Sequence, residues 1–317
     1  MKYNLWPKPK IQSMINHSLR FQKVTKIENL LSLYFPDYYP ILFSSARVAI
    51  YNCLIHSKVS RKDNISIFPY ASHCILDAVS RIAFPNVINN IPALHCIDYH
   101  QWGFVKKMHE KNLLIEDAVD SLYFKNSKLL NQNGKFEVWS LPKILGTSSG
   151  GILWCKNLRD YESIINMRNN LSKSMVHFFI KSLSLYFPSI NKYVQSSEFY
   201  NGGINTLSTG EIYHKIKNWD FYIEQRLKRI KLMSNYFPIW AIYGNSRLPS
   251  NIPALFEKNI DNNYVLNLGI SIGMRMFDKN LSIIEKKFIP VAPIPIHHDV
   301  DLSWLKNLKT SKLLSNI

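Results

Sequence analysis

The chain up to about residue 155 alternates two patterns of hydrophobic and polar positions. Apolar residues recur at helical spacing in residues 46–56 and again in residues 73–84. Short apolar runs with the length of strands lie at residues 65–69, 93–100 and 113–118. Strands that alternate with helices are typical of a mostly parallel sheet with helices on both faces. The first half of the chain therefore predicts an α/β fold.

The alternation continues with a helical pattern at residues 102–112 and changes beyond residue 156. Residues 157–200 are mainly helical and rich in Lys, Asn and aromatic side chains, and residues 219–237 form a long amphipathic pattern. Beyond residue 247 prolines become frequent, and we interpret the apolar runs at 263–271 and 287–296 as short strands.

These changes predict two domains. A large α/β domain would cover residues 1–214, with a helical arm at about 157–200, and a smaller α+β domain would cover residues 215–317.

Composition indicates a globular, basic protein. Its 317 residues, 46% of them hydrophobic and 13% aromatic, can bury a large core. Lys and Arg number 39 and Asp and Glu 22, so the formal net charge of +17 favours anionic partners. Because Asn, Ile and Lys are frequent throughout the chain, we give this charge little weight as evidence of function. No recognised nucleic-acid motif accompanies it, so we expect no nucleic-acid partner.

The cysteines and the N-terminal residues indicate a reducing compartment. The four cysteines are widely spaced in apolar surroundings without a C-x-x-C pair, which is typical of reduced, buried thiols. The first ten residues lack the apolar core of a signal peptide, and the most apolar later stretch is interrupted by Lys181 and Pro188. We therefore expect a cytoplasmic protein without a membrane span.

One apolar run ends in FEVWSLPKILG, residues 136–146, with Ser140 and Lys143 three positions apart. A lysine directly after a buried strand is partly desolvated, which lowers its pKa and makes the neutral amine a nucleophile. Another apolar run ends at Asp117, at the edge where open α/β sheets place their ligand sites. The pattern thus predicts that an amine and a carboxylate meet at one sheet edge.

Two further segments add binding groups to that edge. LFSSARVAI, residues 42–50, offers hydroxyls and free backbone N–H groups at a helix N-terminus capped by Ser44 or Ser45, which is a phosphate-binding arrangement. Ser72 and His73 follow another predicted strand. An amine, a carboxylate, a phosphate cradle and a flat side chain are together what pyridoxal 5′-phosphate requires.

Six segments carry a resemblance to a known family, in this order along the chain: LFSSARVAI, FPYASHCILDAV, DYHQWGF, LLIEDAVDS, WSLPKILGTSSGG and GGINTLS. Together they resemble the DegT/StrS-type nucleotide-sugar aminotransferases, within the aspartate-aminotransferase superfamily of pyridoxal-phosphate enzymes. The C-terminal PVAPIPIHHDVDLSW is similar to the proline-rich, histidine-containing ending of that family. The resemblance covers most of the chain and implies fold type I, with a mostly parallel, seven-stranded-type sheet and a smaller C-terminal α+β domain.

The resemblance also implies roles for individual residues. Lys143 would hold the cofactor as a Schiff base and move the proton during transfer, and Asp117 would pair with the pyridinium nitrogen. Asp120 stands where the family favours glutamine or histidine near the cofactor's phenolic oxygen. His73 would stack on the cofactor ring, with Ser72 as the alternative if the alignment shifts by one.

The phosphate group would be bound by several residues from distant parts of the chain. In the resemblance these are Ser140, Ser45, and the backbone N–H groups of Ala46 and Arg47. Asn205, in GGINTLS, would reach the cofactor phosphate of the neighbouring subunit. That match implies a homodimer with shared active sites.

The activity implied by the resemblance is transfer of an amino group, with glutamate as donor, to a keto sugar linked to a nucleotide. The pathway would be surface-polysaccharide biosynthesis of the O-antigen type. Two alternatives stay open: another fold type I enzyme with a different substrate, and a degenerate family member without catalysis that binds an anionic partner.

Other readings of the same residues are less favoured. S-x-x-K also occurs in penicillin-binding enzymes, but S-D-N is absent and Pro142 fits a loop better than a helix start. Metal ligands could come from two groups, Cys96, Asp98 and His100, or His297, His298, Asp299 and Asp301. Neither group has a second ligand pair, so we assign no metal.

Overall fold

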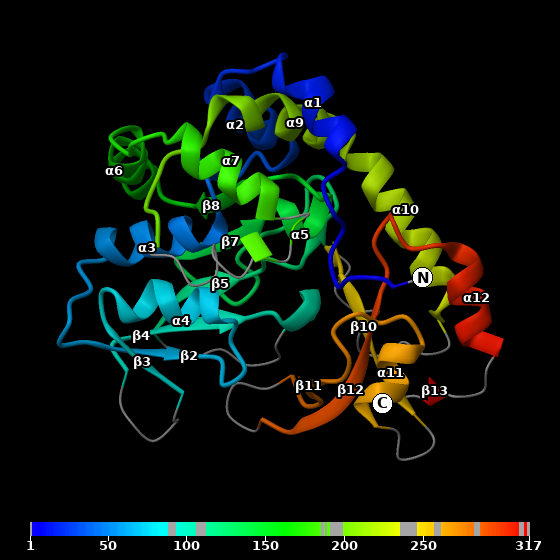
Figure 1. Cartoon of the computed structure of the whole chain (residues 1–317). Helices are drawn as coiled ribbons and strands as arrows, with labels where there is room; N and C mark the ends of the chain where they lie inside the picture. The colour runs from blue at the N-terminus through cyan, green and yellow to red at the C-terminus, as the bar shows by residue number, and fades with distance from the viewer. Residues whose placement is uncertain are drawn as a thin grey trace.

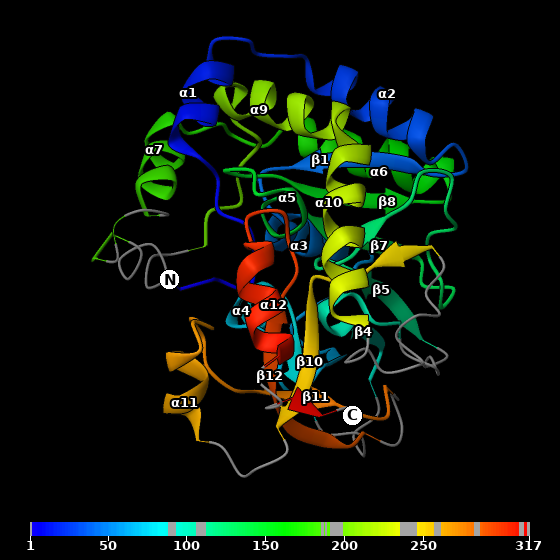
Figure 2. The same ribbon diagram turned by 90° about the vertical axis from the view of Figure 1, so that its right-hand side faces the viewer.

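The computed structural model describes residues 2–87, 93–105, 112–184, 187, 189–190, 199–234, 246–256, 261–281, 286–310 and 314–315. Figures 1 and 2 show a large sheet with helices on both sides and a smaller, C-terminal sheet below it.

Seven strands form the large sheet, in the spatial order β1-β8-β7-β5-β4-β2-β3. They are β1 (Tyr39–Phe43), β2 (Asn64–Ile67), β3 (Phe84–Asn86), β4 (His95–Tyr99), β5 (Leu113–Asp117), β7 (Phe136–Ser140) and β8 (Gly151–Cys155). Only β8 runs antiparallel to its neighbours, β1 and β7. The predicted fold class, a mostly parallel seven-stranded sheet of fold type I with an additional C-terminal sheet, is confirmed.

Helices cover both faces of this sheet because its central strands are apolar on both sides. Along β8, Leu153 and Cys155 pack with α3 (Ala46–His56), α4 (His73–Ser80) and α6 (Leu158–Asn169). Ile152 and Trp154 point to the opposite face, where they pack with helices from the N-terminal and middle parts of the chain. Those helices are α2 (Val24–Tyr34), α5 (Leu141–Leu145), α9 (Thr206–Lys217) and α10 (Trp219–Leu232).

Other helices in the described part of the chain are α1 (Ile11–Ser18), α7 (Met175–Ser184), α11 (Asn262–Asn267) and α12 (Leu302–Thr310). The 3₁₀ turn η1 (Gln101–Gly103) is buried. The predicted helix at 102–112 begins within this turn, and its residues 106–111 lie outside the described residues. Within the described part of the chain, no helix is long and apolar enough to cross a membrane.

The smaller sheet has the order β11-β12-β10-β13, and a two-stranded ribbon joins β6 to β9. Their bounds are β6 (Leu122–Tyr123), β9 (Arg247–Leu248), β10 (Asn251–Phe256), β11 (Arg275–Asp278), β12 (Phe288–Pro295) and β13 (Leu314–Ser315). The strand predicted at 287–296 is thus confirmed as β12. It tolerates three prolines because β11 pairs with residues 288–291 and β10 with residues 292–295, so each half pairs on one side.

The strand predicted at 263–271 is wrong, because residues 262–267 form helix α11. The Asp261 side chain caps this helix by accepting a hydrogen bond from the backbone N–H of Tyr264 at 2.8 Å. A good N-cap outweighs the strand-like composition of Tyr264-Val265.

Candidate active site

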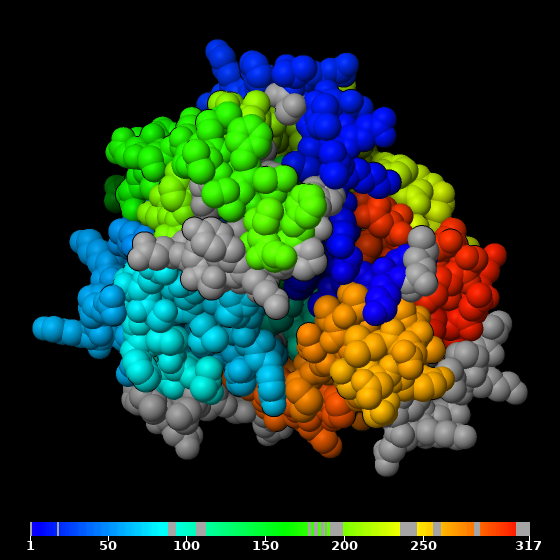
Figure 3. All heavy atoms as spheres, viewed as in Figure 1, coloured from blue at the N-terminus to red at the C-terminus, as the bar shows by residue number. Residues whose placement is uncertain are grey.

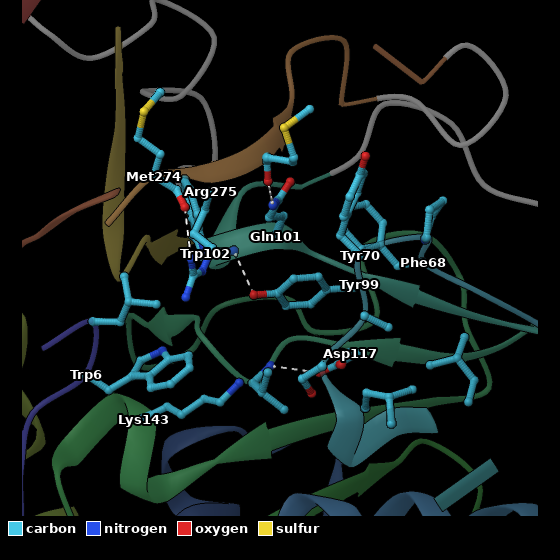
Figure 4. A pocket seen from close by; sticks show the side chains of 18 residues that line it. Trp6, Phe68, Tyr70, Tyr99, Gln101, Trp102, Asp117, Lys143, Met274 and Arg275 are labelled. Atoms are coloured by element: carbon cyan, nitrogen blue, oxygen red, sulfur yellow. Dashed lines mark hydrogen bonds between the residues drawn. The ribbon is translucent and has the colours of Figure 1, made fainter. Parts of the chain in front are cut away.

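The carboxyl ends of the parallel strands meet at one edge of the large sheet, and a cavity of about 590 Å³ opens there. Asp117 is the last residue of β5 and Lys143 follows the end of β7, and both line the cavity. Figure 4 shows the two side chains pointing toward one another, with the Tyr99 ring above them. The predicted meeting of an amine and a carboxylate at this edge is therefore what the structure contains.

Lys143 lies within the short helix α5 and not in a loop. Ser140 is the N-cap residue, Pro142 occupies the first turn, and Gly146 ends the helix in the left-handed region at φ 70°. The lysine side chain is 23% exposed, and its Nζ is 3.5 Å from Oδ1 of Asp120. One short helical turn, ended by Gly146, thus aims the amine into the cavity.

Two cations from neighbouring helices hold the C-terminal end of α5. Lys215 Nζ donates to the carbonyl oxygens of Leu145 at 3.0 Å and Gly146 at 2.9 Å, and Arg226 donates to that of Ile144 at 3.3 Å. Burial lowers the pKa of Arg226 to about 9, and the Asp120 carboxylate opposes that shift. Positive charge at a helix C-terminus is favourable, so these contacts stabilise the helix that carries Lys143.

The loop after α5 is also held by hydrogen bonds to a neighbouring helix. Glu211 of α9 accepts hydrogen bonds from the backbone N–H and the hydroxyl of Ser148, at 3.0 Å and 2.7 Å. Glu211 and Lys215 lie four residues apart on α9, so one helix holds both α5 and the following loop.

Asp117 is 2% exposed, and one of its oxygens accepts a hydrogen bond from the backbone N–H of Val119 at 3.3 Å. Burial raises the pKa of its carboxyl to about 7; the Lys143 ammonium opposes this rise and the Asp120 carboxylate adds to it. A cation in the cavity beside Asp117 would favour the ionised form. The site is therefore suited to a ligand with a protonated ring nitrogen.

Asp120 is fully buried, and its carboxylate accepts hydrogen bonds from two aromatic side chains. The indole Nε1 of Trp6 donates to its Oδ1 at 2.7 Å, and the Tyr99 hydroxyl donates to its Oδ2. Burial raises the pKa of the Tyr99 hydroxyl well above its ordinary value, and Asp120 adds to that rise. The phenol therefore keeps its proton and remains a donor to the carboxylate.

The residues predicted to bind phosphate come from three elements that touch one another. Ser140, at the end of β7, pairs in register with Gly151, the first residue of β8. A Cβ on Gly151 would lie 2.2 Å from the backbone nitrogen of Ala46, so β8 approaches the start of α3 as closely as a glycine allows. Ser45 caps α3 by accepting from the Val48 N–H at 3.3 Å.

The neighbouring helix α4 begins close to the same place. The Arg47 guanidinium donates to Asp77 Oδ2 at 3.1 Å and to Cys74 Sγ at 2.9 Å, both on α4. The N-cap of α4 is Ser72, whose hydroxyl makes no cap hydrogen bond. Arg47 thus links the starts of α3 and α4, and Gly151 brings the start of α3 next to the strand that pairs with Ser140. Helix N-termini are a favourable setting for a phosphate.

Of the predicted site residues, Lys143 and Asp117 line the cavity, whereas Ser140, Ser45, Ala46, Arg47, His73 and Asn205 do not. Ser72 is among the lining residues, whereas His73 is exposed on α4 and is not among them. Asn205 is the N-cap of α9: its Oδ1 accepts from the Leu207 N–H at 2.9 Å and its Nδ2 approaches Met175 Sδ at 3.0 Å. Its role toward a neighbouring subunit stays a prediction.

The sequence patterns missed most of the cavity wall. Trp6, Tyr70, Tyr99 and Trp102 contribute aromatic rings, and β11 contributes Arg275 at the rim. The Gln101 side chain binds β11 through two hydrogen bonds. It donates to the Met276 carbonyl at 2.8 Å and accepts from the Asp278 N–H at 3.1 Å. Tyr70 lies within FPYASH, next to the residues that the sequence did single out, but no local pattern marks Trp6.

The residues present fit pyridoxal 5′-phosphate. A buried carboxyl with a raised pKa suits a pyridinium nitrogen, an accessible amine suits an aldehyde, and the paired helix N-termini with Ser140 suit a phosphate. Among the residues that the structure describes, no group of three or more His, Cys, Asp or Glu side chains could hold a metal ion.

Comparisons with known proteins agree with this chemistry. A family model described as "Putative PLP-dependent aminotransferase" matches residues 27–316. A sequence comparison with curated proteins gives no significant match.

Several solved structures share the fold. PseC of Helicobacter pylori, an aminotransferase involved in the biosynthesis of pseudoaminic acid, has a TM-score of 0.62 at 12% identity, covering 98% of each chain. A DegT DnrJ EryC1 StrS aminotransferase from Brucella abortus has a TM-score of 0.64 at 10% identity, covering 95% of this chain and 94% of that one. NtdA from Bacillus subtilis, with bound cofactor PMP, has a TM-score of 0.63 at 13% identity, covering 95% and 81%.

At these identities the structural likeness shows a shared fold, that of the DegT/StrS-type aminotransferases. The family model spans nearly the whole chain, including Lys143, Asp117 and the phosphate cradle. The chain therefore belongs to the family of pyridoxal-phosphate-dependent aminotransferases, and its cofactor is pyridoxal 5′-phosphate.

Proposed function

We propose that this aminotransferase transfers an amino group from glutamate to the keto carbon of a nucleotide-linked sugar, in the cytoplasm, for surface-polysaccharide biosynthesis of the O-antigen type. The observation that carries the proposal is the cavity itself, with Lys143 and Asp117 at one end and rings of Trp6, Tyr70, Tyr99 and Trp102 on its walls. Aromatic walls with a few convergent polar groups suit the flat, partly apolar faces of a sugar ring.

The rim of the cavity offers a positive charge. Arg275 is exposed at the start of β11, and its guanidinium donates to the Met274 carbonyl at 2.9 Å. A guanidinium recognises phosphate oxygens in a planar, two-pronged geometry, so Arg275 is suited to a nucleoside diphosphate outside the cavity. The names of the fold relatives, which include aminotransferases of sugar pathways, support the same substrate class.

Each functional side chain of this chain then has a task. Lys143 binds the cofactor covalently and, once released, moves a proton at the substrate carbon next to the transferred nitrogen. The Asp117 carboxylate holds the proton on the ring nitrogen, and Ser140, Ser45 and the start of α3 hold the phosphate. When bound, the cofactor withdraws electrons from that substrate carbon.

The assembly is proposed to be a homodimer in which Asn205 serves the neighbouring active site. Helix α7, which starts beside Asn205, exposes Met175, Val176, Phe179 and Leu183 by 46%, 68%, 52% and 46%. An apolar face of this kind favours burial against a second copy. The division into two domains at residue 214/215, which falls inside α9, belongs to the same proposal, in which the smaller C-terminal sheet closes over the cavity that its strand β11 lines.

Absorption spectroscopy tests the assignment of the cofactor lysine. Purified protein with added pyridoxal phosphate is expected to show the visible band of lysine-bound cofactor, and borohydride should fix the cofactor to the wild-type chain. Lys143→Ala should prevent this fixation. The matched control is Lys228→Ala, which removes an exposed lysine paired with Glu224 on α10.

The substrate class is tested in two half-reactions. Glutamate should bleach the band, and a nucleotide-linked keto sugar should restore it. A band that glutamate bleaches but that only simple keto acids restore would overturn the sugar proposal and leave the cofactor assignment standing.

A further inference from the structure

The N-terminal residues 3–7, which we call the N-terminal strap, connect the C-terminal part of the chain to the cavity. The Tyr3 N–H donates to the Gly269 carbonyl at 2.7 Å, and the Ser271 N–H donates to the Tyr3 carbonyl at 2.9 Å. The Asn4 carbonyl lies 3.0 Å from His297 Nε2. In Figure 3 blue N-terminal residues lie against the orange and red C-terminal residues, beside the hollow at the centre.

The other end of the strap lies on helix α5. Pro7 packs against Gly146, the C-cap of α5, where an added Cβ would be 3.0 Å from Pro7 Cβ. Between these anchors the Trp6 side chain turns into the cavity and donates to Asp120 Oδ1 at 2.7 Å. Both ends of the strap are therefore fixed, because backbone hydrogen bonds hold Tyr3 on one side of Trp6 and Pro7 packs against Gly146 on the other.

Trp6 and Asp120 together surround the amine of Lys143. Nζ lies 4.5 Å from the centroid of the Trp6 ring and 3.5 Å from Asp120 Oδ1. An ammonium group over an indole face is attracted by the ring quadrupole, and a carboxylate adds a direct charge interaction. The hydrogen bond from the indole to Asp120 fixes the ring and the carboxylate relative to one another. Both contacts are made by the amine while it is not attached to any other group.

We propose that Trp6 and Asp120 form a dock for the free ammonium group of Lys143, and that Trp6 is the positioning residue of this dock. The proposal rests on the assignment of Lys143 as the cofactor lysine. The dock is occupied when the lysine is free, in the cofactor-free protein and with pyridoxamine phosphate bound. It is empty when the lysine is joined to pyridoxal phosphate. Trp6 therefore biases the chain toward the states in which the lysine has been released.

This bias has a measurable sign. The dock stabilises the cofactor-free state and the pyridoxamine-phosphate state equally. Its loss therefore leaves the dissociation constant for pyridoxamine phosphate unchanged. Pyridoxal phosphate must empty the dock to bind, so its binding becomes tighter when the dock is lost. Cation–π contacts are worth enough to change this balance by about 2- to 30-fold.

The experiment measures dissociation constants for pyridoxal phosphate and pyridoxamine phosphate by titration of wild type, Trp6→Ala and Trp6→Phe. The ratio of the pyridoxamine-phosphate constant to the pyridoxal-phosphate constant is expected to rise by about 2- to 30-fold in Trp6→Ala. Trp6→Phe keeps a ring but loses the hydrogen bond to Asp120, so we expect a smaller rise. It also keeps the test available if the alanine variant does not fold. Trp219→Phe is the matched control, because it removes an indole hydrogen bond, to the Tyr123 carbonyl at 2.7 Å, at a residue that does not line the cavity.

Each outcome of this experiment either supports or overturns the proposed dock. An unchanged ratio, or equal weakening of both cofactor forms, would mean that Trp6 is only structural and would overturn the proposal. A raised ratio in Trp6→Ala with an unchanged ratio in Trp219→Phe supports it. If wild type binds neither form, both the dock and the proposed function are wrong. If both forms bind with the expected ratios but no keto sugar is used, the proposed substrate fails and the dock stands.

Discussion

Replacing Asp117 by asparagine separates two effects of the buried carboxyl: the loss of folding stability when it ionises and its contribution to cofactor binding. The Asp117 carboxyl is 2% exposed, and burial raises its pKa from 3.8 to about 7. The folded chain therefore holds this proton more tightly than the unfolded chain does. As the pH rises from about 4 to about 7, the unfolded chain ionises first, and the free energy of unfolding falls. Above pH 7 this group makes the cofactor-free protein less stable by about 4 kcal/mol.

The asparagine side chain in Asp117→Asn cannot ionise, but its oxygen can still accept the hydrogen bond from the Val119 N–H. In urea unfolding without cofactor, Asp117→Asn is therefore expected to be more stable than wild type at pH 8.5. The advantage should grow by about 2–3 kcal/mol between pH 5 and pH 8.5. Added pyridoxal phosphate should stabilise wild type more than the variant, because only a carboxylate attracts the ring-nitrogen proton.

The control is Asp261→Asn, which also removes one negative charge but leaves a residue that caps α11 well. Equal stability of Asp117→Asn and wild type at pH 8.5, or an advantage that does not change with pH, would refute the reasoning. It would mean that the carboxyl is not held in a desolvated place in the cofactor-free protein.

Three further changes test how the site is held. Lys215→Met keeps the packing of the aliphatic part of the side chain but removes its two hydrogen bonds to α5, so we expect the free energy of unfolding to fall by about 1–3 kcal/mol. In the same denaturation assay Lys217→Met, on the exposed side of the same helix, should have little effect. Ser140→Ala should weaken binding of pyridoxal phosphate by about 5- to 20-fold while leaving binding of pyridoxal, which has no phosphate, unchanged; equal weakening of both ligands would contradict a phosphate role. In Gly151→Ala the new Cβ would lie 2.2 Å from the Ala46 nitrogen, so α3 must move. We expect the free energy of unfolding to fall by about 1–3 kcal/mol and the affinity for the cofactor to fall as well. An affinity equal to that of wild type would show that the phosphate binds elsewhere.

Local patterns were enough to find the elements that carry Lys143 and Asp117. Each of these residues follows an apolar run at the end of a strand, and parallel strands bring their carboxyl ends to a common edge. The cap of α3 by Ser45 was found in the same way, since a serine before a helix is a local signal, and its role in binding phosphate stays a prediction. Where the sequence pattern was misleading, at residues 263–271, another local effect was responsible, the capping of α11 by Asp261.

The sequence by itself thus determined the α/β class, the positions of Lys143 and Asp117 at the sheet edge and the capped start of α3, because strand burial, helix capping and sheet-edge position depend on nearby residues. Only the tertiary structure decided what surrounds them. Trp6 is 114 positions from Asp120, and Lys215 is 70 positions from the Leu145 carbonyl that it binds. No periodicity relates residues so far apart. Their contacts exist because the N-terminal strap, α5 and α9 pack against one another in the folded chain, and packing of distant segments leaves no mark on the local pattern of either one.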